Sequence, residues 1–233
     1  MIIINFYFML RLFMLDSFFD GFRLQPILKI GSNGSVDSYA FEVLSSPCKL
    51  VSSIDDFFLT LPKSLYRALI TVQVNLFSKK KQNFFINIPV FLLQDKDFML
   101  SLSGYRLSNL NFEIQDSHNL LGLTFEELAS LADSISQLKL LGAKTWIDDI
   151  DDQYLDIALK LGVNGVKLDK DFVWHSPNVS EVVSDFQEFG LDVLAEGIES
   201  AYIFSKVVSS KVDFVQGYLW PEINISLDGR FLF

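Results

Sequence analysis

The sequence predicts a closed (β/α)8 barrel of the TIM type. Short apolar runs alternate along the chain with amphipathic helical stretches, a pattern typical of buried strands connected by helices. About eight such runs are present, near residues 25, 40, 86, 112, 146, 166, 194 and 214. The length of 233 residues is close to the ~250 typical of these barrels. The alternative is an open doubly wound sheet, which the lack of a glycine-rich phosphate loop after the first run disfavours.

In the first half of the chain, apolar runs and helix breakers define the expected elements. Ser38–Leu44 is expected to be a strand, as are Phe84–Ile88 and Leu110–Ile114. Between the first two of these, Leu50–Lys80 has helical periodicity. Pro62 interrupts this stretch because proline cannot continue a helix, so two helices are expected there.

In the second half, capping residues mark the helices. Thr124 is followed three residues later by Glu127, a capping-box pattern that predicts a helix ending at Gly142. Gly162 and Gly190 are expected to end two further helices. The remaining expected elements are the strands Lys144–Ile147, Gly165–Leu168, Asp192–Ala195 and Phe214–Val215, and the helices Asp152–Leu161, Ser180–Phe189 and Ile198–Ser209.

Composition restricts the class of protein. Half of the residues are hydrophobic (50%), which excludes a disordered or low-complexity chain. The single cysteine, Cys48, excludes an internal disulfide framework and suits a reducing compartment. The net charge of −10 argues against direct nucleic-acid binding through broad phosphate neutralisation. An anionic substrate would also be repelled unless bound cations invert the local field.

Residues 1–20 form an apolar segment ahead of the single domain expected over residues 21–233. Polar or charged residues interrupt it at Asn5, Arg11 and Asp16. No uninterrupted run therefore reaches the ~20 residues of a membrane-spanning helix, and the basic region and cleavage site of a secretory signal are missing. We expect the segment to pack on the domain or to reflect an upstream start codon, in a cytoplasmic protein without a membrane span.

Polar side chains stand where successive expected strands end. They are Glu42, Asn87, Glu113, the pair Asp148–Asp149, Lys167, Glu196 and Gln216. Because the carboxyl ends of barrel strands converge on one face, we expect these groups to lie together. Carboxylates at close range repel one another, and Mg²⁺ or Mn²⁺ would relieve that repulsion. Two adjacent aspartates that point in different directions could bridge two ions, which predicts a two-metal site for phosphodiester hydrolysis.

Each residue taken alone also has a structural interpretation. A glutamate such as Glu42 or Glu113 at a strand end is typical of a solvated rim residue. Asn87 before a proline is typical of a turn, and the Asp148–Asp149 pair of a helix cap. Lys167 lies between two apolar residues of a buried strand and needs a carboxylate partner. Recurrence at successive strand ends is what favours a site.

Two stretches of the chain resemble hallmark motifs of the bacterial EAL domain family. They are Leu194–Glu199 (Leu-Ala-Glu-Gly-Ile-Glu) and Asp213–Tyr218 (Asp-Phe-Val-Gln-Gly-Tyr). In addition, Glu42-Val43-Leu44 stands where the family's name motif would be, and the resemblance runs from Gln25 to about Pro221. The resemblance implies a modified TIM barrel that hydrolyses cyclic di-GMP to linear pGpG with Mg²⁺ or Mn²⁺ and forms a homodimer.

The resemblance also implies a role for each residue. Lys167 is similar to the family's catalytic lysine and Glu196 to its general base. The positions that match metal ligands are Glu42, Asn87, Glu113, Asp148 and Asp149. The positions that match substrate-binding or site-supporting residues are Gln25, Leu44, Asp116, Glu199 and Gln216.

Departures from the family pattern leave a second hypothesis open. Ser45 and Ser46 replace a Leu-Arg pair whose arginine holds a substrate phosphate, and Asp116 replaces a glutamate. Ile150–Gln153 replaces a Phe-Gly-Thr-Gly turn, which removes backbone freedom where glycine would permit positive φ. The chain is therefore either a phosphodiesterase, even if a slow one, or a degenerate EAL-like protein that regulates through a protein partner. We favour the enzyme, because unneeded buried carboxylates would cost stability.

Overall fold

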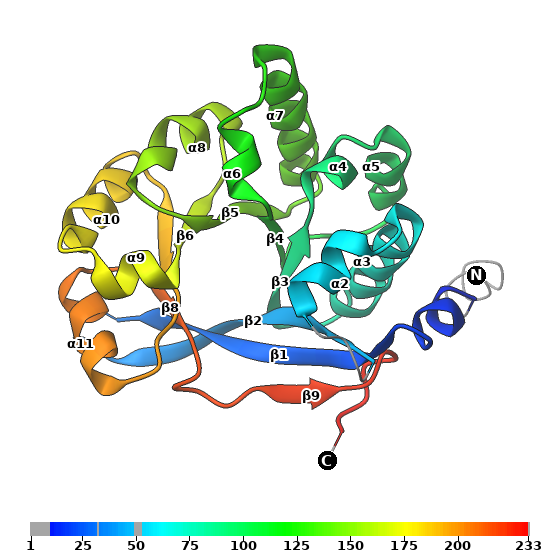
Figure 1. Ribbon diagram of the computed structural model, residues 1–233, viewed down its shortest axis with the longest axis horizontal. Helices are drawn as coiled ribbons and strands as arrows, with labels where there is room; N and C mark the ends of the chain where they lie inside the picture. Colours follow the sequence, from blue (N-terminus) through cyan, green and yellow to red (C-terminus); the bar gives the residue numbers. More distant parts are fainter. Residues whose placement is uncertain (1–9, 32, 49–52, 233) are drawn as a thin grey trace.

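The computed structural model describes residues 10–31, 33–48 and 53–232 and shows a ring of strands with helices around it (Figure 1). The strands are β1 (Phe19–Ile30), β2 (Val36–Pro47), β3 (Asn83–Ile88), β4 (Leu110–Ile114), β5 (Lys144–Ile150), β6 (Gly165–Leu168), β7 (Asp192–Ala195) and β8 (Phe214–Gln216). Neighbours in the chain pair from β1 to β8, and β8 pairs back with β1, so the ring closes. The predicted barrel is confirmed.

The first two strands depart from a strict strand–helix alternation because they form an antiparallel hairpin. The turn is closed by a hydrogen bond from the Gly31 N–H to the Ser35 carbonyl (2.8 Å). A connection this short permits only antiparallel pairing. β1 therefore runs against both neighbours, whereas the pairs from β2 to β8 are parallel. A further strand, β9 (Ile223–Ile225), pairs with β1 outside the ring (Figure 1).

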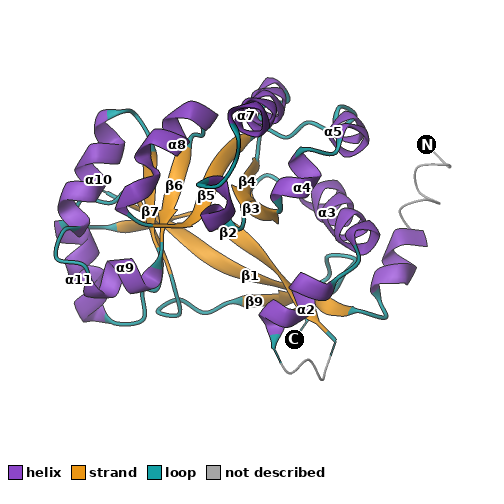
Figure 2. Cartoon of the chain, turned by 45° about the horizontal axis from the view of Figure 1, so that its top comes forward, coloured by secondary structure: helices purple, strands orange, loops and turns teal. Residues whose placement is uncertain are grey.

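Helices cover the outer face of the barrel (Figure 2). They are α2 (Ile54–Thr60), α3 (Lys63–Phe77), α4 (Val90–Leu93), α5 (Lys96–Leu102), α6 (Ser117–Leu120), α7 (Phe125–Leu140), α8 (Leu155–Leu161), α9 (Lys170–His175), α10 (Val179–Glu188) and α11 (Ala201–Ser209), with a 3₁₀ turn η1 (Asp152–Tyr154) before α8. The sequence did not predict α4, α5, α6 or α9. With only four to seven residues each, these helices are too short to establish a helical period.

Local capping chemistry sets the ends of the longer helices. The predicted capping box before α7 is present, with Thr124 and Glu127 bonding reciprocally. Gly162 ends α8 in the left-handed conformation (φ 66°). The last helix, α11, begins after its cap Ser200, later than predicted. Ile198 lies outside it because its backbone N–H donates to a β8 carbonyl (3.0 Å).

An apolar layer fills the barrel interior beneath its mouth. It consists of Ile27, Ala40, Phe85, Trp146, Leu194 and Phe214, all buried. The rings of Trp146 and Phe85 lie 5.1 Å apart, and Trp146 Nε1 donates to Asn111 Oδ1 (3.1 Å), so the indole nitrogen has a partner. On the same inner face of the hairpin, Gln25 and Glu42 follow this layer. The polar side chains at the mouth, such as Gln25 and Glu42, therefore pack on an apolar layer.

The described part of the N-terminal segment packs against the barrel. Residues 10–15 are helical, and Leu12 and Leu15 are buried in the main core. Phe19, the first residue of β1, is buried there too. These residues therefore belong to the packed core, whereas residues 1–9 lie outside the described part of the chain. No helix within the described ranges has the length and apolar character needed to cross a bilayer.

The tight packing around Gly165 predicts that a larger residue at this position destabilises the fold. A Cβ on this residue would overlap the Trp146 ring and come within 2.6 Å of the Asp192 carbonyl oxygen. We expect Gly165→Ala to lower the free energy of unfolding by about 1–3 kcal/mol through overpacking, measured by urea denaturation. Gly104→Ala, where a Cβ would meet nothing within 4 Å, is the control and should change stability by less than about 0.5 kcal/mol. Equal effects of the two substitutions would contradict this packing.

Candidate functional site

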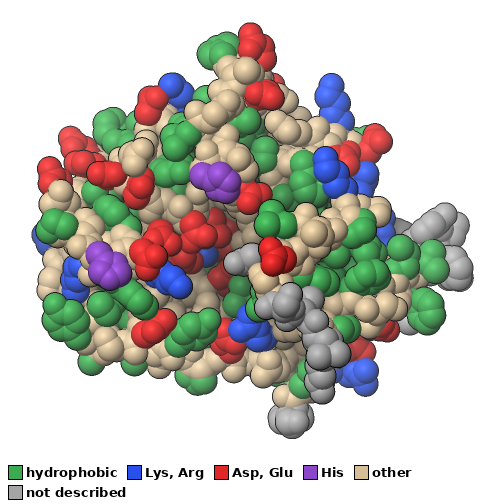
Figure 3. Space-filling view, viewed as in Figure 1, with side chains coloured by type: hydrophobic (Ala, Val, Ile, Leu, Met, Phe, Trp, Pro, Cys, Tyr) green, Lys and Arg blue, Asp and Glu red, His purple; other side chains and the backbone are tan. Residues whose placement is uncertain are grey.

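Polar residues on the inner faces of the strands gather where the parallel strands end. A space-filling view of this face shows acidic side chains in a hollow near its centre (Figure 3). The contributing residues are Gln25 of β1, Glu42 of β2, Asn87 of β3, Glu113 of β4, Asp148 and Asp149 of β5, Lys167 of β6, Gln216 of β8, and Glu196 directly after β7. We call this set the acidic cluster.

Lys167 occupies the centre of the acidic cluster. Its Nζ lies 2.6 Å from Glu196 Oε1 and 2.8 Å from Glu113 Oε1. The same atom is 2.9 Å from Asp148 Oδ1 and 3.6 Å from Glu42 Oε2. The lysine side chain is only 1% exposed. One buried ammonium group is thus surrounded by four carboxyl groups, which it cannot neutralise alone.

Amide side chains orient the Glu42 carboxylate. Asn87 Nδ2 donates to Glu42 Oε1 (2.7 Å), and Gln216 Nε2 donates to Glu42 Oε2 and also to Gln25 Oε1 (2.6 Å). Both amides therefore turn a donor toward the Glu42 carboxylate. Asn87 Oδ1 and Glu113 Oε2 are buried and have no hydrogen-bond partner among the described residues. Such oxygens are costly to leave unpaired and are suited to a cation.

Electrostatics keep Lys167 charged and Glu42 ionised. Burial alone would lower the pKa of Lys167, but the surrounding carboxylates, Asp148 foremost, raise it well above its usual value. Burial would raise the pKa of Glu42, but Lys167 and the hydrogen bonds from Gln216 and Asn87 bring it below its usual value. These two residues form the ionised centre of the cluster.

The other buried carboxyl groups hold their protons more tightly. Burial, followed by the negative charge of Glu42, raises the pKa of Glu113 well above its usual value. Burial also raises the pKa of Asp148 to about 6 and that of Glu196 well above its usual value, although Lys167 opposes both shifts. Because metal ligands must be deprotonated, a divalent cation that binds here would release these protons.

Asp148, Asp149 and Glu196 satisfy a further geometric requirement of a metal site. Each of them offers a carboxylate oxygen within 4.8 Å of the others. The β5–β6 register is interrupted between Ile147 and Ile150, and Asp149 adopts the left-handed conformation (φ 50°). This bulge places Asp148 against Lys167 and leaves Asp149 exposed to solvent. The two adjacent aspartate side chains therefore lie in different environments.

The backbone of residues 150–153, the loop after the aspartate pair, lies outside the left-handed region that favours glycine. None of the described residues 150–153 has a positive φ. Asp151 is extended (φ −120°), and its carboxylate accepts a hydrogen bond from the Gln153 N–H (3.0 Å), which caps η1. The left-handed residue nearest to this loop is Asp149, directly before it, and the effect of the missing glycines on the loop stays a prediction.

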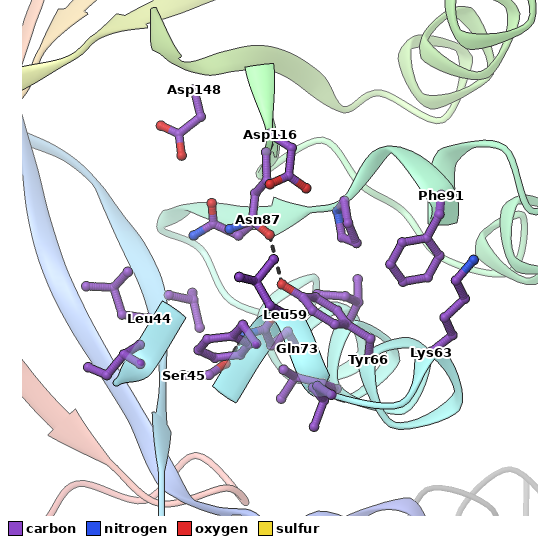
Figure 4. Close-up of a pocket in the computed structure, with 18 of the residues that line it drawn as sticks. Leu44, Ser45, Leu59, Lys63, Tyr66, Gln73, Asn87, Phe91, Asp116 and Asp148 are labelled. Atoms are coloured by element: carbon purple, nitrogen blue, oxygen red, sulfur yellow. Dashed lines mark hydrogen bonds between the residues drawn. The ribbon is translucent and has the colours of Figure 1, made fainter. Parts of the chain in front are cut away.

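A cavity of about 690 Å³ opens beside the acidic cluster (Figure 4). Asp148 and Asn87 lie at one end, whereas Phe91 and Lys63 lie at the other. Between them, the Tyr66 hydroxyl donates to a glutamine side chain of the wall (2.9 Å). Burial, and then the charge of a nearby aspartate, raises the pKa of Tyr66 to about 12, so this hydroxyl stays a neutral donor. The cavity therefore combines a charged end with an aromatic end.

The structure brings together all but one of the predicted site residues. Leu44 and Asp116 line the cavity, and Asp116 adopts the left-handed conformation (φ 57°) at the start of α6. Glu199 is exposed in the loop before α11, and no hydrogen bond or ion pair joins it to the acidic cluster within the described ranges. Its role as a supporting residue stays a prediction.

Most of the cavity-lining residues were not predicted as site residues, among them Arg23, Tyr66 and His118. Arg23 lies two residues before Gln25 on β1, so strand alternation could have placed both on one face. Tyr66 and His118 belong to α3 and α6. No strand-end rule applies to helical residues, and only the packing of the helices on the barrel brings these two to the cavity.

A scan against protein families matches the EAL domain over residues 23–222. The chain therefore belongs to the EAL domain family. The predicted family membership is confirmed. The TIM-like barrel of this chain is a mixed one, in which β1 is antiparallel to its neighbours. A search of curated proteins found no match to the chain.

Solved EAL structures have the same fold. The EAL domain of FimX from Pseudomonas aeruginosa, bound to cyclic di-GMP, has a TM-score of 0.72 at 18% identity, over 97% of this chain and 99% of that one. The EAL enzyme Bd1971, bound to cGMP, has a TM-score of 0.68 at 22% identity, over 97% of this chain and 66% of that one. BlrP1 from Klebsiella pneumoniae, with calcium and cyclic di-GMP, has a TM-score of 0.68 at 20% identity, over 91% and 57%. The chain thus spans two thirds or less of the last two proteins.

The raised pKa of Asp148 predicts how the stability of the metal-free protein depends on pH. The folded-state pKa of about 6 exceeds the ordinary 3.8, so the unfolded chain loses this proton first as pH rises. The stabilising contribution of Asp148 is complete below about pH 4 and is lost as pH rises through about 6. Thermal melts in chelator should show the Tm of the wild type falling relative to Asp148→Asn across this range. A constant difference between the two proteins would contradict the shift.

Proposed function

We propose that the protein hydrolyses cyclic di-GMP to linear pGpG in a reaction that depends on Mg²⁺ or Mn²⁺. The observation that carries this proposal is the acidic cluster, in which Lys167 is surrounded by Glu42, Glu113, Asp148 and Glu196 at the mouth of an EAL barrel. Similar structures hold cyclic di-GMP together with calcium or manganese. The proposal places the activity in the bacterial cytoplasm, in keeping with the single cysteine.

The donor set fits hard divalent cations. The residues that would hold them are Glu42, Asn87, Glu113, Asp148 and Asp149, whose carboxylate and amide oxygens are the ligands that Mg²⁺ and Mn²⁺ prefer. The unpartnered buried oxygens of Asn87 and Glu113 support this fit. When bound, such cations neutralise phosphate charge and lower the pKa of water. They would also reverse the local field that otherwise repels a dianionic dinucleotide from this acidic chain.

The protein's own groups supply the proton transfers. Hydrolysis adds the oxygen of a water molecule to one phosphorus atom, breaks one ester bond and moves a proton to the departing sugar oxygen. Glu196, which has a raised pKa and a side chain 19% exposed, would take a proton from that water. Lys167 stays protonated and can donate a hydrogen bond to the developing negative charge.

An assay with purified protein tests this proposal directly. We expect pGpG to form in the presence of Mn²⁺ or Mg²⁺ and to be absent in chelator. Glu196→Gln should lower kcat by about 10²–10⁴, the usual contribution of a general base. Glu188→Gln, which changes an exposed glutamate on α10, is the control and should keep wild-type turnover. Failure to form pGpG at high enzyme concentration, with Glu42→Ala equal to wild type, would reject hydrolysis.

A degenerate regulator is the second candidate, supported by Ser45 and Ser46 in place of the family's Leu-Arg pair and by the rebuilt loop 150–153. This candidate acts through contact with a protein partner. Calorimetric titration of cyclic di-GMP with Ca²⁺ separates the two, because Ca²⁺ is expected to support binding without turnover. Binding together with turnover in Mn²⁺ favours the enzyme. Absence of both favours the partner-binding protein.

A further inference from the structure

The mouth of the barrel contains a cation that the proposed hydrolysis does not use. Arg23 of β1 lies opposite Leu44 of β2, and two residues further on Gln25 lies opposite Glu42. Residues directly opposite each other in an antiparallel pair have their side chains on the same face. Arg23 is therefore on the inner face of the hairpin, about 7 Å along the strand from Gln25.

The inner face of the hairpin is thus built in three levels. Ile27 and Ala40 belong to the apolar floor, and Gln25 and Glu42 belong to the acidic cluster. Arg23 and Leu44 form the next level outward, and both line the 690 Å³ cavity that Asp148 also lines. Arg23 consequently lies on the cavity wall, one level outward from the acidic cluster.

The surroundings of Arg23 leave most of its donors available. Its Nη1 donates to Glu222 Oε1 (3.2 Å) and Oε2 (3.0 Å), and no other hydrogen bond of this side chain is present within the described ranges. The side chain is 33% exposed. Beside it in the register, Gly21 faces Ser46, and neither residue has a side chain long enough to crowd a ligand.

Lys63, the other cavity-lining cation among the described residues, is placed differently. Its Nζ lies 4.9 Å from the centre of the Phe91 ring. Figure 4 shows Lys63 and Phe91 at the end of the cavity opposite Asp148. Arg23 is therefore the cation that an anion bound partly in the acidic cluster would meet as it enters along the hairpin.

We propose that Arg23 binds the second phosphate of the cyclic dinucleotide, the one that is not hydrolysed. This inference rests on the proposed function, since it concerns the same ligand. A guanidinium group matches phosphate oxygens with parallel hydrogen bonds. Arg23 thus supplies from β1 the phosphate contact that the two serines at the end of β2 cannot make, and it selects a ligand with two phosphates over one with a single phosphodiester.

A purely structural interpretation of Arg23 makes a different prediction. The ion pair with Glu222 joins β1 to the segment that leads into β9, so it also fastens the C-terminal part of the chain. If fastening were its only purpose, Arg23→Gln and Glu222→Gln would break the same contact and have the same effect. Under our proposal only the arginine touches the ligand. Glu222→Gln then keeps or improves affinity, because it removes a negative charge that competes with phosphate.

Calorimetric titration of cyclic di-GMP in Ca²⁺ decides between these alternatives. We expect Arg23→Gln to raise Kd about 10- to 100-fold, the loss typical of a charged hydrogen-bonded contact. Arg23→Lys should bind with intermediate affinity. Glu222→Gln should bind at least as tightly as wild type. Arg106→Gln, which removes an exposed arginine before β4, is the charge-matched control and should bind as wild type does. Unchanged thermal melts confirm that each variant is folded.

A second substrate separates the failure of this inference from the failure of the proposed function. Bis(p-nitrophenyl) phosphate has one phosphodiester and should not reach Arg23, so Arg23→Gln should hydrolyse it with Mn²⁺ within about twofold of wild type. Wild-type binding with no effect of Arg23→Gln overturns the role of Arg23 alone. Wild-type binding that Arg23→Gln weakens, without turnover of either substrate, overturns hydrolysis alone. No binding of cyclic di-GMP by wild type overturns both.

Discussion

The burial of one lysine among four carboxyl groups is the interaction on which the site depends. Lys167 is 1% exposed, and a buried charge is tolerated only when it is paired and hydrogen-bonded. Each partner is fixed by the end of a different strand, so the closed barrel is what allows the arrangement to exist. Because the negative charges outnumber the positive one, the same arrangement is complete only when protons or metal ions add positive charge. Stability and metal binding are thus coupled at one place.

The antiparallel hairpin gives this barrel its functional asymmetry. Its inner face passes from an apolar floor to Gln25 and Glu42 and then to Arg23. A ligand entering along it meets a cation before it meets the acidic cluster. In a chain with a net charge of −10, this order matters, because an anionic ligand otherwise approaches a repulsive surface.

Much of the architecture was predictable from local chemistry. The strands Leu110–Ile114, Gly165–Leu168 and Asp192–Ala195 have the bounds that the apolar runs indicated, since turn residues delimit them sharply. The strand-end polar residues were predictable as a group because barrel geometry forces them together. The antiparallel course of β1, the short helices and the cavity wall at Tyr66 were not, because they depend on how distant segments pack. The left-handed backbone at Asp149 was not predictable either, because it lies two positions before the first of the missing glycines.

The central claim is that the carboxyl groups around Lys167 exist to hold divalent ions at the barrel mouth. Anomalous diffraction from crystals soaked in Mn²⁺ tests it most directly. We expect two peaks, about 3.5–4 Å apart, among the side-chain oxygens of Asn87, Glu113 and Asp148. A mouth without anomalous density, in which Lys167 keeps all four of its carboxyl partners in saturating Mn²⁺, would contradict it.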